Sequence, residues 1–221
     1  MTLSQTPAPA RSDLVVGVPD AGAVAVRPFL NHGVLLSAGA VAWAAAIAVI
    51  GLDPQTPAGE AAYSLGSGLF QLGVLALLRV LWRTNALGTG KVAKAAILVE
   101  TGLLTLAIGS TIADGVGVSD LTQPGWALLD AFWPFSMLGM FFIGIRIAVA
   151  GRWTGAARCW PMIAESWAVV TIPTLMIFGP SVAAVVAPLH LLIGYATLGV
   201  LVARKSAWSG WWGSASITRS R

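Results

Sequence analysis

The sequence predicts an all-α integral membrane protein with six transmembrane helices, arranged as three parallel helical hairpins with a weak internal repeat. Three observations support this prediction. Of the 221 residues, 57% are hydrophobic and only 10% are charged, against about 25% charged in an ordinary soluble domain. The apolar residues gather in six runs of about 20, the length that crosses a bilayer as a helix. Every Lys and Arg residue falls on the same side of these runs.

The six expected spans follow the apolar runs in order. The first is mostly Ala and Gly, which favours close approach of neighbouring helices in lipid. Together the spans form an expected transmembrane domain over 29–205. Before it, the proline-rich segment 1–28 is expected to be a flexible cytoplasmic tail, and after it 206–221, with three tryptophans, a cytoplasmic interfacial tail. The spans are expected at about 33–51, 62–82, 95–113, 126–147, 160–178 and 182–203.

The distribution of positive charge predicts the orientation of the chain. The thirteen cations lie in the two tails, in the connections after the second and fourth spans, and at the adjoining span ends. The three other connections hold no cation, and two of them carry acidic residues such as Asp53 and Asp120. By the positive-inside rule both termini are cytoplasmic in a multi-pass protein of the cell membrane. The net charge of +4 is therefore explained by orientation and contact with anionic lipid, and no nucleic-acid partner is expected.

Two segments of the chain repeat one pattern, which suggests internal symmetry. "TGKVAKAAILVE" ends at Glu100 and "TGAARCWPMIAE" ends at Glu165, at an offset of 65 residues. The span before each segment carries Leu-Gly followed by an arginine, at Arg79 and Arg146. The sixth span offers a weaker third copy. Three hairpins of one orientation would be related by a pseudo-symmetry axis along the membrane normal.

Glu100 and Glu165 are the main candidates for a functional site. Each lies inside the apolar run that follows a cationic segment, and an ionisable residue at that depth is costly unless it is paired or neutral. Arg79 and Arg146 end the preceding spans at comparable depth. We therefore expect structural ion pairs, Arg79 with Glu100 and Arg146 with Glu165. The alternative is a proton-relay or acid role for the two glutamates.

Four further polar residues complete the candidate intramembrane site. Gln71, Ser136 and His190 each precede a glycine in the second, fourth and sixth spans. His190 is interpreted as a neutral hydrogen-bonded group or, alternatively, as a proton acceptor. Asp130 is interpreted as a cap or a water contact of the fourth span, or as part of a cavity mouth. No second histidine lies inside a span and Cys159 is the only cysteine, so no haem, metal or other cofactor is expected.

The sequence leaves three functions open. Nucleotide-binding and common hydrolase motifs are absent. The first interpretation is binding or transport of a small solute, proton-linked, with Gln71, Ser136 and His190 converging on one axis. The second is a membrane-embedded enzyme acting on a lipid or prenyl substrate with a buried carboxylic acid. The third is a non-catalytic accessory or assembly protein. Expected partners are the lipid bilayer, a small-molecule or lipid ligand, and a second copy of the chain.

Overall fold

The computed structural model describes residues 27–205, which contain helices and no strand. Six helical stretches in this range are long and apolar enough to cross a membrane. The chain is therefore an all-helical, multi-pass membrane protein. The expected tail 206–221, and the expected tail 1–28 except for its last two residues, lie outside the described residues.

Four of the spans are single helices and two are interrupted. The fifth span breaks at Ser166, and the sixth contains a π-helical segment, η1, in its middle. The single helices are α1 (Leu30–Ile50), α2 (Pro57–Arg83), α3 (Lys91–Gly115) and α4 (Pro124–Ala150). The interrupted spans consist of α5 (Ala156–Glu165) and α6 (Trp167–Phe178), then α7 (Pro180–Leu191), η1 (Leu192–Ala196) and α8 (Thr197–Ala203).

Local sequence explains where several helices begin and end. The Thr56 side chain caps α2 by accepting a hydrogen bond from the Gly59 amide at 3.1 Å, and Pro57 supplies a favourable first residue. α2 therefore starts before the apolar run does. α4 ends before Gly151, whose φ of 62° is left-handed.

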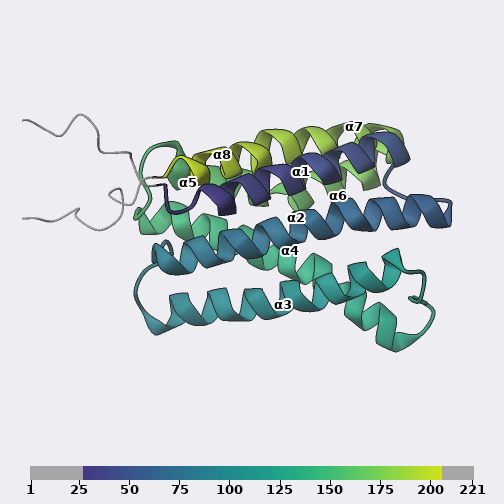
Figure 1. Ribbon diagram of the computed structural model, residues 1–221, viewed down its shortest axis with the longest axis horizontal. Coiled ribbons are helices and arrows are strands. Elements are labelled where there is room, and N and C mark those ends of the chain that lie inside the picture. The colour runs from purple at the N-terminus through teal and green to yellow at the C-terminus, as the bar shows by residue number, and fades with distance from the viewer. Residues whose placement is uncertain (1–26, 206–221) are drawn as a thin grey trace, which may run out of the picture.

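The helices form an elongated bundle in which α1 and α2 are the most extensively packed pair (Figure 1). α1 also packs against α7, η1 and α8, whereas α3 packs against α2 and α4 at the far side of the bundle. An aromatic cluster occupies the interior. The Trp43 ring lies 4.9 Å from Phe70 and from Trp167, and 5.5 Å from Trp133. This cluster joins α1, α2, α4 and α6.

Glycines allow the closest helix contacts, as the composition of the first span led us to expect. A Cβ atom on Gly73 of α2 would lie 2.7 Å from Leu36 Cα, and one on Gly39 of α1 would lie 2.7 Å from Phe70 Cα. The two backbones therefore touch without side chains between them, which maximises van der Waals contact where lipid supplies no hydrophobic drive.

The two ends of the bundle carry opposite charge. We call the end where α1 begins and α8 ends the basic end, and the opposite end the acidic end (Figure 1). Among the described residues, every lysine and arginine belongs to the basic end. The acidic end holds Asp53, Glu60, Asp114, Asp120 and Asp130.

Chemical labelling can test which end faces the cytoplasm. Cys159 is a free, exposed thiol at the basic end. We expect a membrane-impermeant maleimide to modify Cys159 in inside-out vesicles and not in intact cells, because the positive-inside rule predicts that the basic end faces the cytoplasm. A Cys159→Ser chain carrying Asp120→Cys should give the opposite pattern. Labelling of Cys159 from outside intact cells would show that the predicted orientation is wrong.

Candidate functional site

Glu100 is buried in the bundle and hydrogen-bonded to the neighbouring helix. Its side chain extends from α3 and is 2% exposed. Ser136 of α4, 1% exposed, donates its hydroxyl to Glu100 Oε1 at 2.5 Å. Gly139 lies one turn further along α4, and a Cβ there would collide with the Glu100 carboxyl group. The glycine therefore makes the space that the carboxyl group occupies.

Glu165 has an equivalent hydroxyl partner in the other half of the protein. It is the last residue of α5 and is 1% exposed. The hydroxyl of Tyr195, in η1, donates to Glu165 Oε2, while Oε1 has no hydrogen-bond partner. The Tyr195 ring packs edge-on against Phe70 at 4.7 Å. The widened turn of a π segment is often found at functional sites, and here that segment supplies the partner of a buried acid.

The expected ion pairs are not formed. Glu100 and Glu165 each bond to a hydroxyl of the span that follows, not to Arg79 or Arg146 of the span that precedes. Both arginines are exposed. Long cationic side chains reach the polar surface at lower cost than they pair inside an apolar bundle, whereas the two hydroxyl groups already lie at the depth of the acids. The prediction that Arg79 and Arg146 neutralise the two glutamates was therefore wrong.

The remaining mid-span candidates bond to separate neighbours. Gln71 Nε2 donates to Thr111 Oγ1 of α3 at 2.8 Å and to Ser67 at 3.4 Å. His190 Nε2 lies 3.1 Å from the Ser166 hydroxyl, at the break between α5 and α6. No hydrogen bond joins Gln71, Ser136 and His190 to one another. These three side chains therefore do not form the shared contact that we expected from convergence on one axis.

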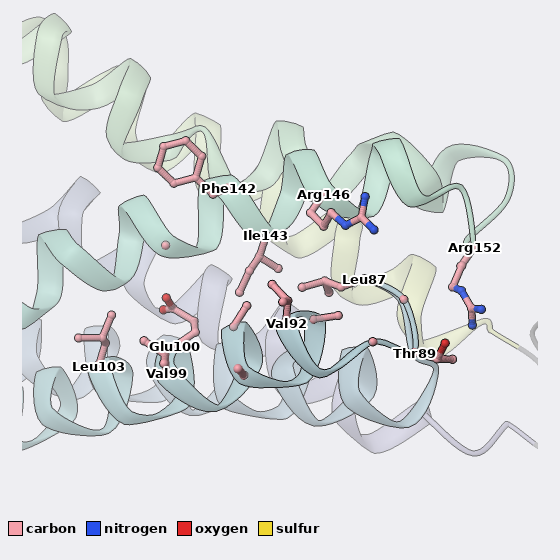
Figure 2. Close-up of a pocket in the computed structure, with 16 residues that line it drawn as sticks. Leu87, Thr89, Val92, Val99, Glu100, Leu103, Phe142, Ile143, Arg146 and Arg152 are labelled. Carbon is pink, nitrogen blue, oxygen red and sulfur yellow. The ribbon is translucent and has the colours of Figure 1, made fainter.

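The Glu100 side chain lines a cavity between α3 and α4 (Figure 2). The cavity measures about 900 Å³, within the roughly 300–1,000 Å³ typical of small-molecule sites. Arg146 and Arg152 lie at its basic end, displaced from Glu100, with Thr89 beside Arg152. Most of its wall is apolar. The apolar lining includes Val92, Ala93, Ala96, Val99, Leu103, Phe142 and Ile143.

This α3–α4 cavity is open toward the surface that faces lipid. Val92 is 83% exposed and Phe142 is 60% exposed, although both are large apolar residues inside membrane-spanning helices. A ligand could therefore enter from the bilayer rather than through a water-filled channel.

Asp130 lies at a second, smaller cavity at the acidic end. It is in the interior of α4, and the residue that precedes this helix, Gln123, makes no side-chain cap. The capping interpretation of Asp130 was therefore wrong. Asp130 instead borders the cavity together with Glu60 and Asp114, in agreement with the alternative that it forms part of a cavity mouth.

Several residues of these clusters were missed by the sequence reasoning. Tyr195 is the most important, because it holds Glu165 from an interrupted span. A signal was available: a tyrosine in the middle of an apolar run must find a partner for its hydroxyl group. Ser166 and Thr111 carried no comparable signal, because hydroxyl residues in membrane helices commonly bond to their own backbone.

The sequence matches no protein-family model, and comparison with curated proteins and with solved structures also gives no match. Fold and composition define the class, a multi-pass helical membrane protein with two buried carboxyl groups. Within residues 27–205, no cluster of three or more His, Cys, Asp or Glu side chains could hold a metal ion.

Proposed function

We propose that the protein binds and transports a small amphiphilic solute through the α3–α4 cavity. The observation that carries the proposal is the order of side chains along this cavity: two arginines at one end, apolar walls, and the buried Glu100 carboxyl group further in. A solute with an anionic group and a hydrocarbon chain matches that order.

The charged group of the solute would bind at the basic end. Arg146 and Arg152 both line this part of the cavity, and guanidinium groups bind phosphate and carboxylate through charge-assisted hydrogen bonds. The hydrocarbon chain would lie along Val92, Val99 and Phe142, in the direction of Glu100. Because the cavity opens toward lipid, the solute would enter from the bilayer.

Proton linkage is part of the proposal. Glu100 and Glu165 each contact a hydroxyl group and no cation, so proton exchange is the means by which their charge can change inside the membrane. A hydroxyl can both donate and accept. Ser136 and Tyr195 can therefore stay bonded to the carboxyl group in either protonation state, which suits a transport cycle that alternates between them.

The three-hairpin arrangement, the internal repeat and cytoplasmic termini remain parts of the same proposal. The contacts of the two glutamates support the repeat, because each accepts from a hydroxyl of the next span. A parallel repeat places equivalent acids on equivalent helices, which is how a transporter built from duplicated hairpins would obtain two proton sites.

Enzymatic action on a lipid or prenyl substrate is the second candidate. The specific observation in its favour is that Glu100 lies beside an apolar cavity without a cationic partner. An ion pair would have kept the carboxylate charged and made it a poor acid. Without one, the carboxylic acid could donate its proton to a carbon–carbon double bond of a bound prenyl chain. The resulting carbocation would lose a proton from a neighbouring carbon to the carboxylate, which restores the acid and leaves the double bond in a new position.

Binding of dodecyl phosphate to the protein in lipid nanodiscs tests the shared site. We expect saturable binding above that of empty nanodiscs, and at least a ten-fold loss of affinity in the double variant Arg146→Gln, Arg152→Gln. Arg83→Gln removes a cation of the same end outside this cavity and should bind as wild type does. Equal affinity of the double variant and Arg83→Gln would overturn the proposal.

A second measurement separates the candidate functions. In proteoliposomes, a transporter should move a fluorescent dodecyl phosphate across the bilayer unchanged, and Glu100→Gln should slow this transfer at least ten-fold. An enzyme should instead convert farnesyl phosphate into a new product, detected by mass spectrometry and lost in Glu100→Gln. Binding with neither transfer nor product would leave the accessory or assembly role as the explanation.

A further inference from the structure

We propose that the cavity at the acidic end is a separate binding site for a small organic ammonium ion. This cavity of about 190 Å³ lies between α2, α3 and α4, with Trp43 of α1 at its edge. It shares no lining residue with the α3–α4 cavity. The inference therefore stands independently of the transport proposal.

Negative charge is concentrated at this cavity without compensation. Glu60, Asp114 and Asp130 line it from three different helices, and the charge of Asp114 acts on both of the others. Among the described residues, no lysine or arginine belongs to the acidic end. Carboxylates held together in a partly enclosed space create a field that attracts a cation.

A buried hydroxyl group without a partner points to an occupant of the cavity. Ser110 lines the cavity, is 2% exposed, and its Oγ has no hydrogen-bond partner. Directly behind the lining, Gln71 uses its amide nitrogen on Ser67 and Thr111 and leaves Oε1 without a partner. Buried polar groups are nearly always bonded. The Ser110 oxygen is therefore an acceptor in the wall of an acidic cavity, as a cationic N–H donor or its hydrating water would require.

Three aromatic rings form part of the cavity wall and select the type of cation. The Trp43 ring lies 6.4 Å from Tyr63 and 5.5 Å from Trp133, edge to face in both cases, and all three rings line the cavity. Aromatic faces next to carboxylates are the recognition elements for alkylammonium groups. The acidic side chains form no cluster that could hold a metal ion within the described part of the chain.

The size of the cavity limits the ligand to a small molecule. A volume of about 190 Å³ equals that of about six water molecules at roughly 30 Å³ each. It is smaller than the roughly 300–1,000 Å³ of sites for drug-sized ligands. An ammonium ion with a few carbon atoms fits these limits, whereas a polyamine chain or a lipid does not.

Calorimetric titration with methylammonium chloride tests the inference, because this ion carries both an N–H donor and a methyl group. The protein is held in nanodiscs of neutral lipid, and sodium chloride keeps the ionic strength constant. We expect saturable binding to the wild type and at least a ten-fold loss of affinity in Asp114→Asn. Asp130→Asn serves as a second variant if Asp114→Asn does not fold. Trp133→Leu should also weaken binding, because it removes an aromatic wall and keeps the charge.

Asp120→Asn is the matched control. Asp120 is an exposed carboxylate of the same end that does not line the cavity. Hydrogen bonds from the side chains of Thr122 and Gln123 lower the pKa of Asp120, so it is charged at neutral pH like a cavity acid. Its replacement should leave binding unchanged. The double variant Arg146→Gln, Arg152→Gln should also bind methylammonium normally, which distinguishes this site from the α3–α4 cavity.

Two results would overturn the inference. One is the absence of saturable binding, which would mean that the cavity holds only water or sodium. The other is an equal loss of affinity in Asp114→Asn and Asp120→Asn, which would indicate general attraction of cations to the acidic end rather than binding in the cavity.

Discussion

Replacing Gly139 by alanine is expected to displace the Glu100 carboxyl group and to reduce dodecyl phosphate binding at least ten-fold. The added methyl group would occupy the space that Glu100 Oε2 now fills. Because the carboxyl group is the end of a flexible side chain, it can rotate away from α4. It then loses the Ser136 hydroxyl and enters the cavity, where the hydrocarbon chain of the solute would lie.

The effect of Gly139→Ala should separate function from stability. Alanine is favoured over glycine in a helix by about 1 kcal/mol, which is about equal to the cost of the lost hydrogen bond. We therefore expect a small change in thermal unfolding in detergent together with the large loss of binding.

Gly102→Ala is the control for this substitution. Gly102 is an exposed glycine of α3, and a Cβ there would meet no atom within 4 Å. It should bind dodecyl phosphate as wild type does. Normal binding by Gly139→Ala would show that the position of the Glu100 carboxyl group does not matter for the solute.

Replacing Gly33 by valine is expected to give the largest loss of stability. A Cβ on Gly33 would collide with backbone atoms of Gly199 and Ala203 in α8. Backbone atoms cannot rotate aside as a side chain can, so α1 and α8 must separate. Overpacking in a close contact costs typically about 1–3 kcal/mol, and this site is at the upper end because both sides of the contact are main chain.

The measurement is thermal unfolding of the purified protein in detergent, compared with Gly102→Ala. We expect a clear decrease in the unfolding temperature for Gly33→Val and a similar decrease for Gly199→Val. The double variant should lose less than the sum of the two single losses, since the first substitution already opens the shared contact. Unchanged unfolding temperatures in both single variants would contradict the close approach of α1 and α8.

The helices were predictable from sequence because the membrane leaves few alternatives. An apolar run of about 20 residues must satisfy its own backbone in lipid, and a helix is the simple way to do so. The six expected spans therefore agree with the six helical stretches of the structure. The position of the cations at one end of the bundle was also predictable, because the positive-inside rule applies to multi-pass membrane proteins in general.

The partners of the buried acids were not predictable in the same way. Counting along a helix gives the depth of Glu100 and of Arg79, but not the direction in which each side chain points around its helix. Packing sets that direction, and it turned Glu100 toward Ser136 and left Arg79 exposed. Tyr195 is a further case, because the π segment that contains it shifts the helical phase within an apolar run of uniform composition.

The opposite charge of the two ends also restricts how copies of the chain can assemble. A protein with cations and acids mixed at both ends can insert in either direction. Here all described cations belong to one end, so the positive-inside rule predicts one direction of insertion for every copy. A homo-oligomer of this chain is therefore expected to consist of parallel copies around an axis perpendicular to the membrane, and not of antiparallel copies.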